Sequence, residues 1–310
     1  CQKDHSKLQF PKMCRQTKPI KGPRKDKLSI LLTSSSFHCT DEKDEKGPLA
    51  PSKKSVCLTI AVVIVLLTIS ERILRYIITT YFTHLHPVLE IEENQHILAR
   101  HIGVDAVACY TISTLGYMNR HILSDVFTTD RKAVEKSSPS HVRIYNYQPE
   151  AHRILLIFLA YQIKNTHDSW VWNDGAIFIA HHIFAGLTAW FGMYPGIASM
   201  YGLFFMGMSE ISTCVLCLLA NFDPRYGVPG LDTAFPMTKI VLAVIFAVVF
   251  FIIRVMAWPV FAYHFLFDSI EVLKRNTVKE TSEVKFALKM MVGSCIGLTA
   301  LQILWFGEII

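Results

Sequence analysis

Seven long apolar segments alternate with polar stretches along most of the chain. A helix needs about 20 mostly apolar residues to cross the hydrocarbon core of a bilayer, and these segments are close to that length. Inside a bilayer only helices and closed barrels satisfy their own backbone hydrogen bonds. We therefore predict an all-α, polytopic membrane helix bundle of about seven transmembrane helices. The segments lie at 57–81, 101–118, 153–170, 175–192, 196–219, 238–263 and 288–306.

The composition supports a membrane protein rather than a soluble one. Hydrophobic residues make up 51% of the chain and charged residues 18%, whereas soluble domains carry about 25% charged residues. Two segments are weaker than the rest. Segment 57–81 is interrupted by charges, of which Glu71 and Arg75 are spaced to pair on one helix face. Segment 153–170 is strongly apolar only at its start, so whether these two segments cross fully is left open.

Residues 1–55 carry 13 Lys and Arg against 6 Asp and Glu. This stretch is polar and lacks any periodicity, which predicts a disordered, basic cytosolic tail ahead of a transmembrane domain at 56–310. The tail either contacts anionic lipid headgroups or is solvated without a partner. We expect no nucleic-acid partner, because the positive charge lies in a tail and not on a folded face.

The distribution of Lys and Arg between the loops predicts the orientation of the bundle. Cytosolic loops of membrane proteins carry the excess of these residues. With seven spans, the basic tail and two other Lys/Arg-rich regions fall on one side, which places the N-terminus in the cytosol. The rich regions are 119–153 and 268–289, and the poor loops are 83–97, 165–174 and 221–236.

Motifs for metals and nucleotide cofactors are missing from the sequence. There is no H-E-x-x-H, Walker loop, G-x-G-x-x-G or G-x-S-x-G. Cys214 and Cys217 form a C-x-x-C inside an apolar segment. We interpret them as packing residues, because a redox motif requires water and a βαβ context. We predict no metal site and no resident cofactor.

Ionisable residues gather at bilayer depth in two neighbouring segments. Such residues are rare and usually mark a functional site. Asp174 precedes His181 by seven residues, so the two share a face of a continuous helix. The chain turns back near residue 194, which brings Glu210 to a depth between Asp174 and His182.

A carboxylate beside an imidazole orients it and raises its basicity, as proton transfer requires. The candidate catalytic residues are therefore His181, His182, Glu210 and Asp174, lining one pocket. The alternative is that these polar side chains only hydrogen-bond neighbouring helices.

Residues 150–265 resemble the TLC domain, which is shared by the TRAM, Lag and CLN-type membrane proteins. Three pieces carry the resemblance in order. Residues 181–184 read His-His-Ile-Phe, residues 209–213 read Ser-Glu-Ile-Ser-Thr, and residues 249–254 read Val-Phe-Phe-Ile-Ile-Arg. The resemblance implies an endomembrane lipid role. In the ceramide synthase members, which join a fatty acyl group from acyl-CoA to a sphingoid amine, the double histidine is essential, and this transfers to His181 and His182.

Arg254 and Asp168 are the two candidate lipid contacts. Arg254 follows about 15 residues after the start of the sixth segment, deeper than the histidines, where it would hold a lipid phosphate or pair with a helix terminus. The aspartate that the family has in the preceding span falls near Asn165, Asp168 or Asp174. The synthase branch has a His-Asp and a further Asp about 27 residues after the first histidine, where this chain has Met-Ser-Glu-Ile-Ser-Thr at 208–213. The sequence is therefore more similar to the plain TLC-domain proteins than to the synthases.

We predict a TLC-domain protein of the endoplasmic reticulum or another endomembrane. It would act in membrane lipid homeostasis by binding or modifying a membrane lipid in an intramembrane pocket. Two alternatives stay open. One is a ceramide-synthase-like N-acyltransferase with acyl-CoA as co-substrate and a histidine as general base. The other is a non-catalytic lipid sensor or sorting partner. Homo-oligomer formation is left open as well.

Overall fold

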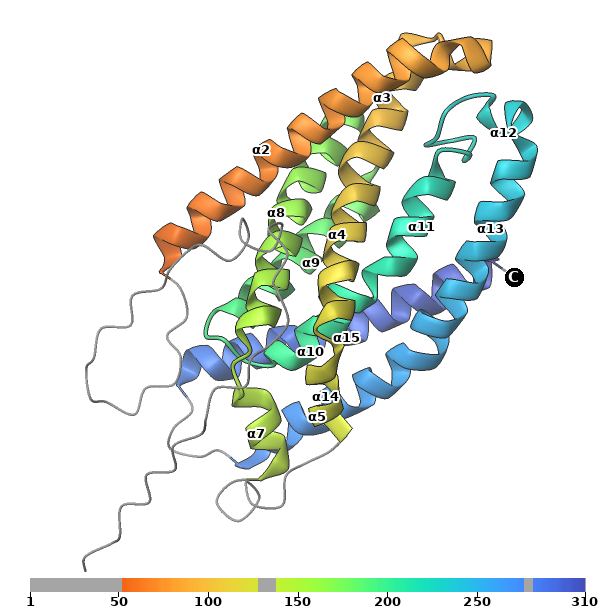
Figure 1. The fold of residues 1–310 in the computed structure, drawn as a ribbon. Helices are drawn as coiled ribbons and strands as arrows, with labels where there is room; N and C mark the ends of the chain where they lie inside the picture. The colour runs from red at the N-terminus through yellow and green to blue at the C-terminus, as the bar shows by residue number, and fades with distance from the viewer. Residues whose placement is uncertain (1–51, 128–137, 276–280, 310) are drawn as a thin grey trace, which may run out of the picture. The chain divides into compact units, whose positions relative to one another are not determined.

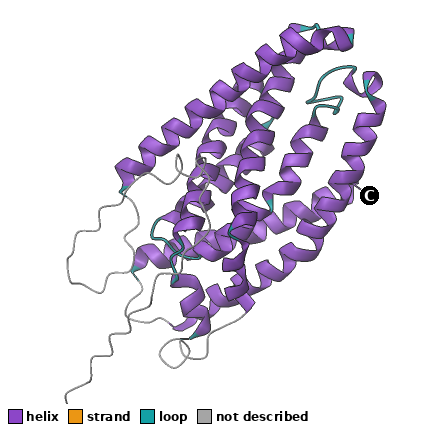
Figure 2. Cartoon of the chain, viewed as in Figure 1, coloured by secondary structure: helices purple, strands orange, loops and turns teal. Residues whose placement is uncertain are grey.

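The computed structural model describes residues 52–127, 138–275 and 281–309. Every regular element in these ranges is a helix, and Figure 2 shows no strand among them. The chain divides into units at 1–46 and 47–310, and the fold described below is that of the second unit. The all-α prediction is confirmed. The predicted tail at 1–55 falls outside the described residues except for its last four, and there a helix already begins at Lys53.

The helices follow one another with short connections. The α-helices are α2 Lys53–Ile77, α3 Glu92–Arg100, α4 Val107–Met118, α5 Ser124–Phe127, α7 Pro139–Tyr145, α8 Pro149–Trp172, α9 Ala176–Met193, α10 Ser199–Leu203, α11 Glu210–Ala220, α12 Leu231–Ala234, α13 Pro236–Phe250, α14 Trp258–Arg275 and α15 Ser282–Ile309. The π-helical turns are η2 Ile78–Phe82, η5 His101–Ala106, η7 Phe204–Met208 and η8 Phe251–Ala257, and the 3-10 turns are η3 Thr83–Leu85, η4 Pro87–Leu89 and η6 Arg120–Leu123.

In the described part of the chain, five helical stretches are long and apolar enough to cross a membrane. The predicted segments 101–118 and 153–170 are also helical, but they are too polar to meet that requirement. The predicted count of seven is therefore not confirmed. The five stretches are Lys53–Leu85, Ala176–Met193, Ser199–Ala220, Pro236–Arg275 and Ser282–Ile303.

Helix α8 is polar because it lies among other helices rather than against lipid. It contacts α2, α4, α9 and α10, and Figure 1 shows it in green beside α4 and α9. A buried polar side chain is tolerated where neighbouring helices supply hydrogen-bond partners. Helix α8 thus presents polar groups to the interior of the bundle. Its buried polar residues are His152, Gln162, Lys164, Asn165, Asp168 and Ser169.

Three of the π-helical turns, η5, η7 and η8, lie between consecutive α-helices. Each turn adds a residue to the helix and often marks a functional site. At η8 the cause is visible in the sequence. Pro259 follows the turn, and its ring lacks an N–H donor and clashes with the carbonyl four residues earlier. The turns place Asp105 within η5, Glu210 shortly after η7 and Arg254 within η8.

Helix α4 packs closely against the π-helical turn η7, and Gly116 lies at the point of contact. A Cβ atom at this position would lie 2.7 Å from the backbone nitrogen of Met208 and 2.9 Å from the carbonyl carbon of Gly207. Real Cβ contacts are never that short, and the obstacle is backbone that cannot rotate away. A glycine is therefore required here, and it keeps α4 against the turn that precedes Glu210.

We expect Gly116→Ala to lower the free energy of unfolding by about 1–3 kcal/mol, which is the usual cost of forcing extra atoms into a packed core. The matched control is Gly293→Ala, because a Cβ atom there has nothing within 4 Å. Alanine is the better helix former by about 1 kcal/mol, so the control should leave stability unchanged or raise it. Titration with a denaturing detergent measures both variants, and equal effects at the two positions would contradict the close crossing.

Candidate functional site

Glu210 and Arg254 form a buried ion pair between α11 and the turn η8. Arg254 Nη2 lies 3.6 Å from Glu210 Oε1, and the two side chains are 13% and 9% exposed. The same guanidinium donates from Nε to Ser212 Oγ at 3.0 Å and from Nη2 to Thr213 Oγ1 at 3.1 Å. The two sequence pieces at 209–213 and 249–254 are thus joined directly. Arg254 is occupied by these bonds, and its contact with a lipid headgroup stays a prediction.

Two further side chains adjoin this ion pair. Cys109 Sγ, on α4, lies 3.6 Å from Glu210 Oε2. The Arg254 guanidinium carbon lies 5.0 Å from the ring centroid of Trp258, which is a cation–π distance. Glu210 and Arg254 therefore connect α4, α11 and the start of α14 in one contact.

The paired histidines lie together on α9 and are half-buried. The rings of His181 and His182 are 5.4 Å apart and meet edge to face. His182 Nδ1 lies 2.8 Å from Gln162 Oε1 on α8. Because an amide oxygen only accepts, Nδ1 carries the proton and Nε2 is left as a base. His181 lies within range of the positive charge of Arg254. Gln162 is therefore a partner of His182 that the sequence did not indicate.

Asp174 does not share a helical face with His181, and the expectation of a shared face is wrong. Helix α9 begins only at Ala176, after Gly175 with φ of 108°. Asp174 therefore lies in the turn between two helices, where Arg100 donates to Oδ1 from Nη1 at 3.2 Å and to Oδ2 from Nη2. Burial raises the pKa of Asp174, but the hydrogen bond and charge of Arg100 outweigh it and hold the pKa below its usual value. Its role at the histidines stays a prediction.

Asp168 belongs to an ion-pair cluster within the bundle. Lys164 Nζ lies 2.5 Å from Asp168 Oδ2 and 3.1 Å from Glu71 Oε2. The predicted pair between Glu71 and Arg75 is wrong, because Arg75 binds Glu92 instead, at 2.6 Å. For Glu71 and Arg75, partners on neighbouring helices replace the partner on the same helix, because Glu71 binds Lys164 on α8 and Arg75 binds Glu92 on α3. Lipid contact by Asp168 stays a prediction.

The six candidate residues thus fall into separate groups. Asp174 is held by Arg100, and Asp168 by Lys164, through hydrogen bonds that do not involve the histidines. In the described ranges, no group of three or more His, Cys, Asp and Glu side chains is arranged to hold a metal ion.

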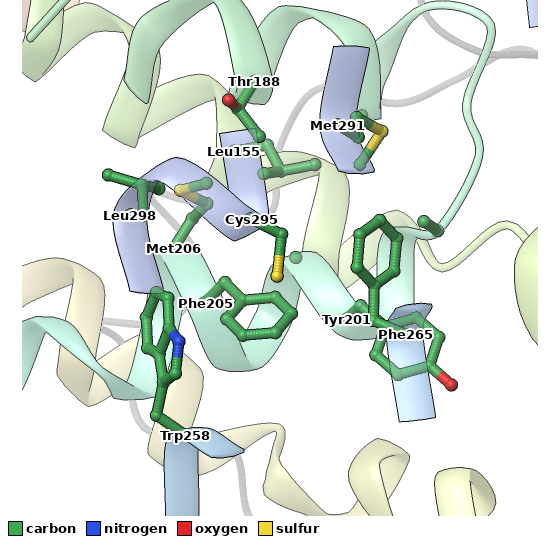
Figure 3. A pocket seen from close by; sticks show the side chains of 13 residues that line it. Leu155, Thr188, Tyr201, Phe205, Met206, Trp258, Phe265, Met291, Cys295 and Leu298 are labelled. Atoms are coloured by element: carbon green, nitrogen blue, oxygen red, sulfur yellow. The ribbon is translucent and has the colours of Figure 1, made fainter. Parts of the chain in front are cut away.

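A pocket lies beside the ion pair and has mostly apolar walls. Its empty volume is about 440 Å³, part of which is open to the outside. Figure 3 shows Phe205, Trp258 and Phe265 along one side and residues of α15 on another. None of the six candidate residues lines it. The lining residues are Leu155, Thr188, Gly192, Ala198, Tyr201, Gly202, Phe205, Met206, Trp258, Phe265, Met291, Cys295 and Leu298.

The polar groups of the pocket walls already have hydrogen-bond partners inside the protein. Trp258 Nε1 donates to Thr299 Oγ1 at 3.0 Å, and Thr188 Oγ1 donates to the carbonyl of Phe184 at 2.8 Å. The Tyr201 hydroxyl donates to Asp268. The walls carry no charged side chain. The pocket therefore offers a hydrocarbon environment and no donor group for a carboxylate or phosphate.

A second polar cluster, which the sequence did not indicate, holds one end of this pocket. Arg143 on α7 binds the fully buried Asp268 on α14 through two hydrogen bonds of 2.6 Å. Ser140 Oγ donates to Glu271 at 2.6 Å. Because Tyr201 lines the pocket and also binds Asp268, the short helix α7 supports the pocket wall. No spacing rule links Arg143 to a residue 125 positions later, which is why this cluster was missed.

Five apolar helical stretches around a buried polar centre define a multi-pass integral membrane protein of the helical class. The sequence profile of the TLC domain matches residues 98–310, which is more than half of the chain. The chain therefore belongs to the TLC-domain family, and the resemblance seen at 150–265 is confirmed and extends further in both directions. No curated protein and no solved structure matches the chain.

Proposed function

We propose that the protein binds the hydrocarbon part of a membrane lipid in the pocket and acts in membrane lipid homeostasis. The observation that supports this most is the pocket itself, which is apolar and lies between α8, α9, α10, α14 and α15. Ligand pockets are mostly apolar cavities with a few polar groups at the edge. In a protein that lies within a bilayer, the abundant molecules of that chemistry are lipids. An endomembrane such as the endoplasmic reticulum is the proposed location.

The pocket adjoins the polar residues that the family motifs contain. Trp258 forms part of its wall and packs against Arg254. A lipid chain in the pocket would therefore lie one side chain away from the pair of Glu210 and Arg254. This arrangement supports a role for the pair in sensing or modifying the bound lipid.

Filling the pocket should remove the lipid. We expect Cys295→Trp to reduce the lipid that co-purifies with the protein in mild detergent about tenfold or more, since an obstruction that costs about 1.4 kcal/mol has that effect on affinity. Mass spectrometry of extracted lipid, normalised to protein, measures it. Cys295 is buried and lines the pocket, whereas Cys57 is exposed, so Cys57→Trp is the matched control.

Thermal unfolding of both variants shows whether each is folded. A folded Cys295→Trp protein that retains as much lipid as the Cys57→Trp protein would overturn the proposal for this pocket.

A second candidate function is acyl transfer to an amine, and one observation favours it. Gln162 fixes the tautomer of His182 so that Nε2 is basic. That nitrogen would take the proton of an amine as the amine attacks the thioester carbonyl of an acyl-CoA, forming an amide and releasing the CoA thiol. Labelled acyl-CoA and a long-chain base test it. Amide product that disappears in His182→Ala assigns this reaction, and lipid retention without turnover assigns a non-catalytic sensor.

A further inference from the structure

A cluster of buried charges, separate from the lipid pocket, joins α2, α3, η5, α8 and the turn before α9. It contains two cations, and both are already paired. Arg100 binds Asp174, while Lys164 binds Asp168 and Glu71. One further carboxylate, Asp105 in η5, lies within range of the charges of Arg100, Lys164 and Asp168. The cluster therefore has four carboxylates against two cations, a surplus of two negative charges when all are ionised.

Asp105 is the member of this cluster without an ion pair among the described residues, and its hydrogen-bond partner is the side chain of Asn165. It is 7% exposed, and its Oδ1 is fully buried with no partner. Asn165 on α8 is 4% exposed and lies within hydrogen-bonding reach of Asp105, and its Oδ1 also has no partner. Leaving a buried polar group unsatisfied costs about 1–3 kcal/mol, and an unpaired buried charge costs far more. Each of these two oxygens therefore needs a partner.

The chemistry of the two atoms defines that partner. Both are acceptors, so the partner is positively charged or carries a donated proton. A divalent ion is a poor fit, because in the described ranges no group of three or more His, Cys, Asp and Glu side chains is arranged to hold a metal ion. We propose that Asp105 and Asn165 form a binding site for one small monovalent cation, supplied as Na⁺ or as a proton. A proton on Asp105 would be donated to Asn165 Oδ1, and Na⁺ would lie between the two oxygens.

The site formed by Asp105 and Asn165 lies close to the residue that orients His182. Asn165 follows Gln162 by three residues, about one helical turn, on α8. Gln162 is the partner of His182. A cation that holds η5 against α8 at Asn165 therefore fixes the helix that orients the imidazole. The site needs neither the lipid pocket nor any reaction, and it stands independently of the proposed function.

Thermal unfolding of the full chain in non-ionic detergent tests the site, with tryptophan fluorescence as the readout. NaCl is exchanged for N-methyl-D-glucamine chloride at constant ionic strength, and separately the pH is varied from about 5 to 8. If Na⁺ is the occupant, the unfolding temperature rises with Na⁺ concentration. If a proton is the occupant, it falls as the pH rises, because the folded protein binds one proton more than the unfolded chain.

Asp105→Asn removes the negative charge and keeps the shape of the side chain, so the response should vanish in this variant. Asp125→Asn is the control, since Asp125 is an exposed carboxylate on α5, and it should keep the wild-type response. The other charged or titratable groups that face Asp105 come from three neighbouring helices, and they are Arg100, Tyr161, Lys164, Asp168 and Cys217. A response that persists in Asp105→Asn would assign it to these groups and overturn the proposal. A wild-type protein that responds to neither Na⁺ nor pH would overturn it as well, without any variant.

Discussion

Arg254→Met should lower the free energy of unfolding by about 3–5 kcal/mol. The substitution leaves the buried carboxylate of Glu210, whose side chain is 9% exposed, without its cation, and breaking a buried ion pair from one side has this cost. It also removes the hydrogen bonds to Ser212 and Thr213. Titration with a denaturing detergent, followed by circular dichroism, measures the change.

The matched control for this change is Arg225→Met, because Arg225 is exposed in the connection between α11 and α12. We expect it to stay within about 0.5 kcal/mol of the wild type, as surface substitutions do. Adding Glu210→Gln to Arg254→Met removes the unpaired charge and should recover part of the loss. If the double variant is as unstable as the sum of the two single variants, Glu210 and Arg254 do not stabilise each other.

The second large effect is expected for Arg143→Leu, again about 3–5 kcal/mol. Asp268 has no solvent exposure and accepts hydrogen bonds from Arg143, Tyr201 and Ser140, so losing the guanidinium leaves a buried carboxylate whose remaining partners are neutral. Its hydrogen bonds with Asp268 raise the pKa of Arg143, which is therefore ionised throughout the accessible pH range. Helix α7 should detach from α14, and limited proteolysis of this region measures that detachment alongside the loss of stability.

Arg153→Leu is the control for this variant. Arg153 is an exposed arginine ten residues after Arg143, near the start of α8. It should change neither the proteolysis pattern nor the stability beyond about 0.5 kcal/mol. Protection of α7 that survives Arg143→Leu would show that the backbone contacts of this segment, such as Ala198 N to Ile144 O at 2.7 Å, suffice to dock it.

Apolar periodicity and segment length predicted the helices well. All seven apolar segments are helical in the structure, since a long apolar run has no other way to satisfy its backbone. The number of spans was harder to predict. Helix α8 is covered by its neighbours over most of its surface. It therefore does not need the high content of apolar residues by which a transmembrane helix is recognised in a sequence.

The candidate site was predicted in part. The reversal of the chain near residue 194 follows from the sequence, but the partners of the candidate residues do not. Arg100 and Asp174 are separated by 74 positions, and Lys164 and Glu71 by 93. The π-helical turns add residues that shift every later side chain by about 100°, so a face assigned from regular 3.6-residue spacing is wrong beyond each turn. Asp174 was misplaced for a related reason, because the break at Gly175 ends the helical spacing.

The polar character of α8 also bears on how the chain is made. On the scale measured for insertion by the translocon, a charged residue near the centre of a helix costs about 2.5–3.5 kcal/mol. Lys164 and Asp168 would therefore keep α8 from partitioning into a bilayer alone. The helix can enter lipid only together with the neighbours that neutralise it, and Glu71 on α2 is synthesised before it. We therefore expect α2 and α8 to enter the bilayer together, with α2 remaining at the insertion machinery until α8 has been synthesised.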